Sequence, residues 1–319
     1  MARAPRGLRL PRARHRRDRR RRGGLTGEPS TPGEGFAPDR RAVRIVVVDI
    51  SLIVDNGRPW PEIRELAQTA DGLGAYAVYL CDHFMGHTDD DSISDEPMLE
   101  SMTLLAALGP LTERVRLGPM VLGGTYRHPA VVANQITALD HVSGGRAIAG
   151  LGAGWQVNEH AAYGIELPAP GPLSDRFEET VAVVSALLRE GRATYEGRYF
   201  QVHDAPNQPA PVQERLPILV GGGGERRTIP MAARYADVWH IWGKPESYAA
   251  KSAQLDAACE AIGRDPAEVK RATGFPFPVG TDYLEKLEPY REVCDEFVVF
   301  DWFDRPLQST IDDLTAALG

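Results

Sequence analysis

The chain has 319 residues, of which 43% are hydrophobic and 25% charged, the ordinary balance of a globular enzyme. The formal net charge of −8 combines a basic stretch, residues 1–44, with 14 Arg against four acids (+10), and an acidic remainder (−18), which disfavours non-specific binding of nucleic acid or anionic membranes. The three cysteines have no disulfide or zinc spacing, and no apolar run reaches the roughly 20 residues of a membrane helix, so we expect a cytoplasmic protein that binds a small molecule.

The N-terminal stretch, residues 1–43, is rich in Arg and broken by Pro and Gly, with almost no apolar periodicity. This composition predicts a disordered basic tail. The basic run at residues 15–22 has the charge to bind nucleic acid, but no aromatic or structured element accompanies it. We therefore prefer a solvated tail, or translation from a start codon upstream of the true one. The folded domain is expected over residues 44–319.

Short β-branched runs alternate with amphipathic helical patterns along this domain. Strands are expected at residues 44–52, 77–80, 115–122, 147–150, 218–220, 238–241, 270–275 and 297–300. Helices are expected at 60–73, 98–108, 130–141, 177–188, 225–235, 248–262, 282–292 and 307–318, with a hairpin at 193–202. Eight strands, each followed by a helix, predict an α/β fold of the (β/α)8 (TIM) barrel type, with a doubly wound open sheet as the alternative.

Chemistry in such a barrel lies on the loops that follow the strands. Asp82 and His83 follow the second expected strand. A carboxylate and an imidazole at the barrel mouth suit general acid–base catalysis, because His titrates near neutral pH. Taken alone, the dipeptide is equally typical of a structural aspartate beside a packed histidine.

Glycine-rich segments follow the third and fourth expected strands, at residues 118–124 and 150–154. Glycines let a backbone approach a flat ligand closely, although simple strand termination is the alternative. The second segment superficially resembles a dinucleotide fingerprint but lacks the acidic residue that this motif requires. Small residues that widen the barrel mouth explain it equally well.

The sharpest local signal is the run Gly221-Gly222-Gly223-Gly224 between the fifth strand and its helix. Successive N–H groups at a helix N-terminus form an anion-binding nest, so we expect a phosphate there. Arg226 and Arg227 follow and either add to the positive charge or pair with surface acids.

Aromatic residues end the sixth expected strand, in the run Trp239-His240-Ile241-Trp242-Gly243-Lys244. Such side chains can wall an aromatic ring system, and Lys244 can meet a phosphate. For Trp239 we prefer a place in the core between barrel and helices.

Several motifs together resemble the luciferase-like superfamily. They are residues 125–131, residues 139–146, the run Gly152-Ala153-Gly154-Trp155, and residues 217–228. The most similar members are actinobacterial proteins described as using the deazaflavin coenzyme F420. The resemblance implies a homodimeric barrel of the bacterial luciferase type that transfers a hydride between F420 and a small organic substrate. An FMN-dependent monooxygenase is the alternative, and a non-catalytic flavin-binding barrel the second alternative; a metal-dependent hydrolase and a metal site are not expected.

The same resemblance implies roles for individual residues. A non-prolyl cis peptide near Met120 and Val121 would back the cofactor ring, with Asp82 at the ring edge, Asn158 near the cofactor, and the four-glycine turn on the phosphate. The cofactor-binding residues implied are Asp82, Met120, Val121, Gly123, Gly154, Asn158, Gly221, Gly222, Gly223, Gly224 and Gly243.

His83 stands where glucose-6-phosphate-type members have an active-site base, so it is expected to be catalytic. His87 replaces a Trp of those members and Trp155 replaces an acid, and both are expected to face the substrate. These two departures put a sugar-phosphate substrate in doubt while leaving cofactor binding untouched.

Overall fold

The structure is a computed structural model that describes residues 48–88, 90–274, 287–301 and 306–318. The expected basic tail, residues 1–43, lies outside the described residues, as do residues 282–286 of the helix expected at 282–292. The described end of that helix, Glu288–Tyr290, is a short 3₁₀ turn.

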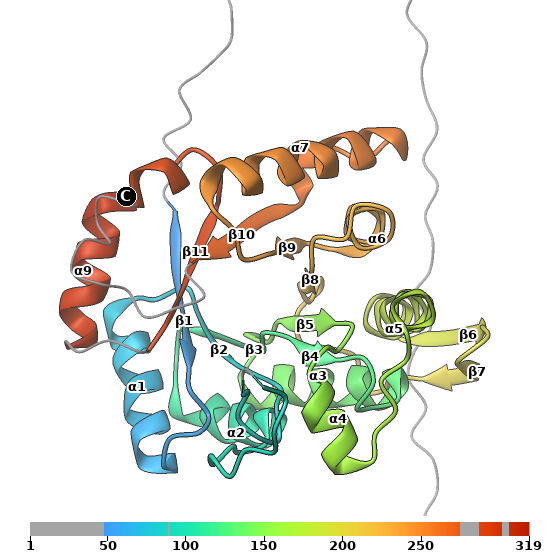
Figure 1. The fold of residues 1–319 in the computed structure, drawn as a ribbon, viewed down its shortest axis with the longest axis horizontal. Coiled ribbons are helices and arrows are strands. Elements are labelled where there is room, and N and C mark those ends of the chain that lie inside the picture. Colours follow the sequence, from blue (N-terminus) through green and yellow to red (C-terminus); the bar gives the residue numbers. More distant parts are fainter. Residues whose placement is uncertain (1–47, 89, 275–286, 302–305, 319) are drawn as a thin grey trace, which may run out of the picture. The chain divides into compact units, whose positions relative to one another are not determined.

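Nine parallel strand segments follow one another in the order β3-β2-β1-β11-β10-β9-β8-β5-β4 (Figure 1). Their bounds are β1 Asp49–Val54, β2 Ala77–Leu80, β3 Arg116–Pro119, β4 Leu122–Gly123, β5 Ala149–Gly152, β8 Ile218–Gly221, β9 Val238–His240, β10 Lys270–Gly274 and β11 Glu296–Phe300. β3 and β4 are two parts of one strand, separated by a cis peptide between Met120 and Val121. A parallel bridge from Leu117 to Ala147 brings the two ends of the sheet together. The predicted (β/α)8 barrel is confirmed.

Helices follow the barrel strands as the periodicity predicts. They are α1 Trp60–Leu73, α2 Ser101–Leu108, α3 Pro129–Val142, α5 Pro170–Glu190, α6 Thr228–Tyr235, α7 Pro245–Ala261 and α9 Leu307–Leu318. One more helix, α4 Val157–Tyr163, was not predicted and occupies a stretch that the sequence pattern assigns to a loop. No helix of the described residues is long and apolar enough to cross a membrane.

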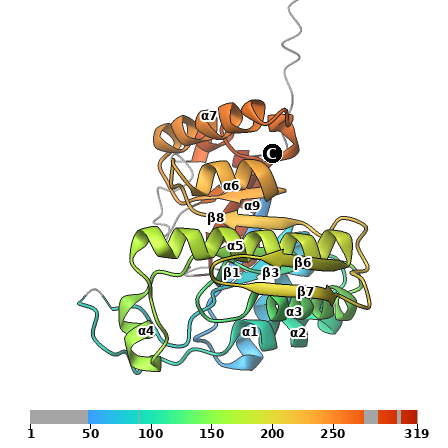
Figure 2. The same cartoon turned by 90° about the vertical axis from the view of Figure 1, so that its right-hand side faces the viewer.

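The predicted hairpin is present as an antiparallel pair, β6 Arg192–Glu196 and β7 Gln201–Pro206. It lies beside α5 and takes no part in the barrel (Figure 2). It therefore interrupts the barrel between β5 and β8 without changing the strand order.

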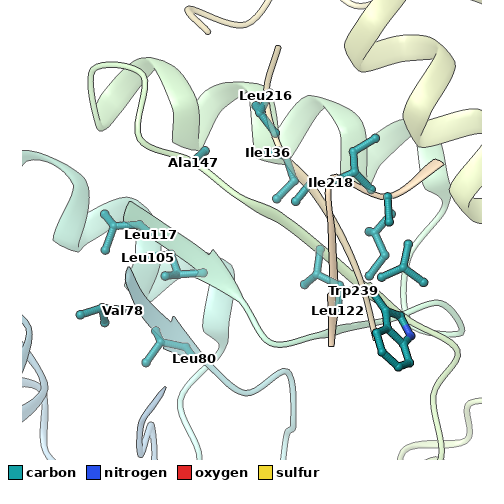
Figure 3. Close-up of a cluster of buried hydrophobic side chains, with 14 of the residues drawn as sticks. Val78, Leu80, Leu105, Leu117, Leu122, Ile136, Ala147, Leu216, Ile218 and Trp239 are labelled. Carbon is teal, nitrogen blue, oxygen red and sulfur yellow. The ribbon is translucent and has the colours of Figure 1, made fainter. Parts of the chain in front are cut away.

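Two apolar layers hold the barrel together, because successive strand side chains point to opposite faces. In β1, Leu52 and Val54 join the layer between the sheet and the helices, whereas Ile53 points into the barrel. Figure 3 shows part of the outer layer, with Ile136 of α3 among the strand residues. Trp239 belongs to this layer, as predicted, and is fully buried.

Two glycines allow neighbouring strand backbones in the barrel to lie in direct contact. A Cβ atom on Gly150 would lie 1.9 Å from the carbonyl oxygen of Pro119, and one on Gly274 would lie 1.8 Å from that of Val298. No side chain can be accommodated there without moving a strand. Part of the glycine pattern therefore serves close packing of the strands, which was not among the explanations considered for it.

A polar cluster occupies the barrel interior at the amino ends of β1 and β11. The buried carboxylate of Glu296 accepts hydrogen bonds from Ser51 (2.6 Å) and Tyr79 (2.9 Å), and Lys270 Nζ lies 3.3 Å from it. This cluster leaves the carboxyl ends of the strands as the open mouth.

Candidate active site

A cavity of about 580 Å³ lies at the carboxyl ends of the strands. Its size is within the roughly 300–1,000 Å³ range of small-molecule sites. The lining comes from the last residues of β4, β5, β8, β9 and β11, from the residues just after β2, β5, β8 and β9, and from the junction of β3 with β4. Tyr126, in the loop after β4, completes it. The cavity therefore lies where a barrel of this type carries its chemistry.

Ten of the predicted site residues line this cavity: Asp82, His83, Met120, Val121, Gly123, Gly154, Trp155, Gly221, Gly222 and Gly223. The structure thus brings together segments that are far apart in the sequence. The cis peptide predicted near Met120 and Val121 is confirmed, and both residues are part of the lining.

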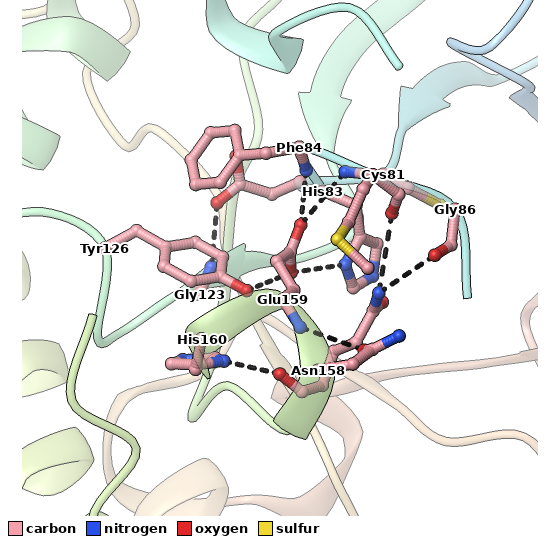
Figure 4. Close-up of polar contacts among 12 residues, drawn as sticks. Cys81, His83, Phe84, Gly86, Gly123, Tyr126, Asn158, Glu159 and His160 are labelled. Atoms are coloured by element: carbon pink, nitrogen blue, oxygen red, sulfur yellow. Dashed lines mark hydrogen bonds and ion pairs between the residues drawn. The ribbon is translucent and has the colours of Figure 1, made fainter. Parts of the chain in front are cut away.

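His83 is held by a carboxylate that the sequence analysis did not single out. Its Nδ1 lies 3.0 Å from Oε2 of Glu159, on α4 (Figure 4). The Glu159 side chain is fully buried, whereas 22% of the His83 side chain remains exposed. Glu159 is therefore enclosed by the protein, whereas the His83 ring reaches the cavity.

Glu159 is also bound by its other neighbours. Its Oε1 accepts from the backbone N–H groups of Phe84 and Met85, and its Oε2 accepts from the hydroxyl of Tyr126 (Figure 4). Burial acts to raise the pKa of Glu159, but the hydrogen bonds from His83, Phe84 and Tyr126 outweigh it, so the pKa lies below its usual value. Glu159 is therefore ionised at neutral pH.

Tyr126 contributes to the same arrangement from the loop after β4. It lines the cavity, and its ring lies 4.9 Å from that of His160, measured between centroids. Burial, followed by the hydrogen bond to Glu159, raises the pKa of the Tyr126 hydroxyl. Tyr126 is therefore a neutral donor to Glu159.

Asp82, which is predicted at the ring edge, lines the cavity and is held by several neighbours. Its carboxylate accepts four hydrogen bonds, one each from Ser101 Oγ and Gly123 N, both at 2.9 Å, and two from Arg127, at 2.6 and 2.9 Å. A carboxylate has about four acceptor positions, which these bonds occupy. The side chain of Asp82 thus has a structural part, and its contact with a cofactor ring stays a prediction.

The four-glycine turn partly meets the expectation of an anion nest. Gly221, Gly222 and Gly223 line the cavity. Helix α6 begins at Thr228, five positions after Gly223. The N–H of Gly222 donates to the carbonyl of His240 at 2.9 Å and is therefore not available to a phosphate. The predicted nest loses one of its donors to the fold.

The basic residues around this turn are distributed differently from the prediction. Arg227 forms an ion pair with Asp175 on α5, so the surface-pairing alternative is the right one for it. Lys251 of α7, which the sequence analysis did not consider, donates to the carbonyl of Gly223 at 2.7 Å. Lys244 is exposed and is not part of the cavity lining.

Aromatic rings wall the cavity on two sides. Trp242 and Phe300 lie 5.4 Å apart between ring centroids, on the side of β9 and β11. Trp155 stands on the opposite side, after β5, with its ring 5.6 Å from that of His83. Such walls suit a flat ring system.

Four predicted residues lie outside the lining. The ring of His87 lies 5.1 Å from that of Trp155, measured between centroids, in an edge-on arrangement. The Asn158 amide donates to Thr88 and Ser92 and so holds the loop after β2. Gly224 is exposed, and the Gly243 carbonyl accepts from Tyr290. Their predicted ligand contacts remain predictions.

A family model described as luciferase-like monooxygenase matches residues 45–315. The chain belongs to this family. Luciferase-like members similar to it include an F420-dependent glucose-6-phosphate dehydrogenase of Microbacterium testaceum, 32% identical over 234 residues, which covers 72% of the chain and 68% of that protein. Pyrimidine monooxygenase RutA of Agrobacterium fabrum is 30% identical over 221 residues, which covers 67% of the chain and 59% of RutA. The chain thus spans about three fifths to two thirds of the length of these relatives.

Solved structures of similar fold include an F420-dependent secondary alcohol dehydrogenase in complex with an F420-acetone adduct. Its TM-score is 0.74 at 17% identity, over 85% of the chain and 99% of that structure. The monooxygenase RslO1 from Streptomyces bottropensis has a TM-score of 0.62 at 18% identity, over 84% and 96%. These likenesses confirm the luciferase-like barrel. Together with the family match, they show that the chain has the barrel of the luciferase-like monooxygenase family.

Proposed function

We propose that the protein transfers a hydride between coenzyme F420 and a small organic substrate, with His83 as the residue that exchanges a proton with the substrate. The observation that carries this proposal is that His83, backed by the buried Glu159, shares one cavity with the glycine turn and the aromatic walls. A protein that only binds a cofactor has no need of an imidazole held in this way, so the His83–Glu159 pair argues against a non-catalytic barrel.

The residues present fit a flat, anionic cofactor. The cavity has aromatic walls that can hold a ring system. At Gly223 the backbone itself lines the cavity, so an anionic group can approach it closely. His240 also lines it, and its Nε2 is buried without a hydrogen-bond partner among the described residues. Lys251 places a positive charge beside the turn. These groups would hold the cofactor, which supplies the hydride chemistry when it is bound.

The protein's own residues have three tasks in this proposal. Trp155 and Trp242 confine the ring system and exclude water from its faces. Met120 and Val121 form the part of the lining contributed by the interrupted third strand. His83 holds or receives a proton at the ring nitrogen that Glu159 does not bind.

An FMN-dependent monooxygenase remains the second candidate, because RutA, a monooxygenase by its name, resembles the chain about as closely as the F420-dependent relative does. Titration with each cofactor separates the two. Intrinsic tryptophan fluorescence should respond to cofactor binding, because Trp155 and Trp242 line the cavity. Trp239 is not among the lining residues and should contribute an unchanged background. Saturable quenching by F420 without a response to FMN is expected, and the reverse pattern would replace this proposal by the monooxygenase.

The homodimer that the family resemblance implies is also a proposal. Light scattering of the purified protein should give twice the mass of one chain. A mass equal to a single chain at micromolar concentration would contradict it.

A further inference from the structure

Two histidines in the described part of the chain form the same kind of contact in opposite surroundings. His83 Nδ1 lies 3.0 Å from Glu159, and His203 Nδ1 lies 3.0 Å from Glu196. Glu196 and His203 are on the exposed hairpin, with side chains 65% and 72% exposed. The first pair faces a cavity and the second faces solvent, so the second provides a natural comparison.

All other groups that contact the Glu159 carboxylate are donors. They are the N–H groups of Phe84 and Met85 and the hydroxyl of Tyr126. With these donors around it, the carboxylate is an acceptor only. The hydrogen of the bond to His83 must therefore be on Nδ1, because two acceptors at 3.0 Å would repel each other.

A neutral imidazole carries one hydrogen, so a hydrogen on Nδ1 leaves a lone pair on Nε2. We propose that Glu159 is a positioning residue that fixes His83 in the Nδ1–H tautomer, so that Nε2 presents a proton acceptor to the cavity. This inference rests on the proposed function for the use of that acceptor, namely to take a proton from the substrate.

The proton balance follows directly from this arrangement. When a proton passes from the substrate to Nε2, the substrate atom keeps the bond's electron pair and the imidazole becomes a cation. The Nδ1–H bond to Glu159 stays in place, and the adjacent carboxylate stabilises the new positive charge. Glu159 thus orients the ring and stays hydrogen-bonded to it throughout the transfer, without itself touching the substrate.

Tyr126 has a separable part in this unit. Its hydroxyl donates to the same oxygen, Oε2, that binds His83. Replacing it with Phe removes one donor from the carboxylate but leaves the contact with His83. Tyr126→Phe should therefore keep the tautomer, whereas Glu159→Gln, which removes the charge, should not.

Nitrogen NMR of the protein labelled with ¹⁵N-histidine, without cofactor, tests the proposal. The wild-type signal of His83, assigned by its loss in His83→Gln, should show a protonated Nδ1 and an unprotonated Nε2 at pH above the titration of the ring. In Glu159→Gln the ratio of the two tautomers should change by about tenfold or more, because a hydrogen bond to a charged acceptor has been replaced. Glu196→Gln, the matched change at the exposed pair, should leave the His83 signal unaltered.

Two results would overturn the proposal: a wild-type His83 with hydrogen on Nε2, or a tautomer ratio unchanged by Glu159→Gln. The wild-type measurement decides the matter even if the variant does not fold. Neither measurement involves a cofactor, so the positioning role can fail while F420 binding succeeds, and the reverse. With the cofactor identified, Glu159→Gln should lower kcat by about 10² or more with little change in KM.

Discussion

The guanidinium of Arg127 binds the carboxylate of Asp82 through two parallel hydrogen bonds, at 2.6 and 2.9 Å. Both side chains are largely buried, with 12% and 0% exposed. The pair joins the end of β2 to the loop after β4, beside the part of the cavity wall that Asp82 contributes. Asp82 was expected at the ring edge, but this pairing makes it a brace for the cavity wall.

Replacing Asp82 with Asn should therefore reduce stability. The change leaves Glu100, at 2.7 Å, as the only carboxylate that pairs with Arg127 among the described residues. Breaking a buried pair costs up to about 3–5 kcal/mol, and the remaining Glu100 contact places the expected loss below that range. Asp204→Asn is the matched control, because Asp204 pairs with Arg192 on the exposed hairpin, where ion pairs contribute about 0–1 kcal/mol. Urea unfolding of both variants measures the difference. Equal stability of the two variants would show that Asp82 is free for a ligand role.

His83→Ala should leave cofactor affinity nearly unchanged and lower the rate by about 10²–10⁴, the usual contribution of a general acid or base. The side chain contacts Glu159 and the edge of Trp155 but is not needed to form the barrel. Affinity from fluorescence titration and turnover in steady state provide the two readouts, with His203→Ala as the exposed control. Turnover equal to that of the wild type would remove His83 from the mechanism.

Gly223 offers the cleanest test of an anion at the glycine turn. Gly222 has a φ of 125°, so any side chain there strains the backbone, whereas a Cβ on Gly223 meets Ile241 and Lys251 at 3.3 Å, which asks for a small shift. Gly223→Asp places a carboxylate against the expected phosphate, and Gly223→Asn places a neutral group of the same size. The affinity for the cofactor should fall at least about tenfold further in Gly223→Asp than in Gly223→Asn. The same loss in both would mean that space, and not charge, is disturbed.

His240 predicts a pH dependence of stability. Burial lowers its pKa to about 3, whereas an unfolded histidine titrates near 6.5. Below pH 6.5 the unfolded chain binds a proton that the folded chain does not, so this contribution is complete above pH 6.5 and is lost as the pH falls toward 3. Between pH 7 and pH 5 the free energy of unfolding falls by about 2 kcal/mol from this histidine. Urea unfolding should show this loss in the wild type and in the control His203→Asn, and a smaller one in His240→Asn; an equal loss in all three proteins would contradict it.

The barrel could be predicted from the sequence because its strands are short apolar runs with clear glycine boundaries. Gly74, for example, ends α1 in the left-handed conformation at the predicted position, with a φ of 80°. The third strand was expected to be continuous from 115 to 122, but the cis peptide divides it into β3 and β4. Periodicity does not report on peptide isomers, and only the family resemblance indicated this feature.

The site was predicted less completely, because a motif shows which residues follow a strand but not which side chains meet. His83 was found from its place after β2, but Glu159 lies 76 positions further along the chain on a helix of seven residues. A helix that short has little periodicity to detect. The four hydrogen bonds to Asp82 were equally hidden, since all their donors, on Ser101, Gly123 and Arg127, come from later segments.

Helix α4 sets a limit on how this enzyme can be adapted to new substrates. Trp155, which is expected to face the substrate, and Glu159, which holds His83, are separated by only three residues. An insertion or deletion between them would change the pocket and displace the carboxylate in the same step. Exchange of the side chain at Trp155 therefore changes the pocket alone, whereas a change of length between Trp155 and Glu159 would also disturb the contact with His83.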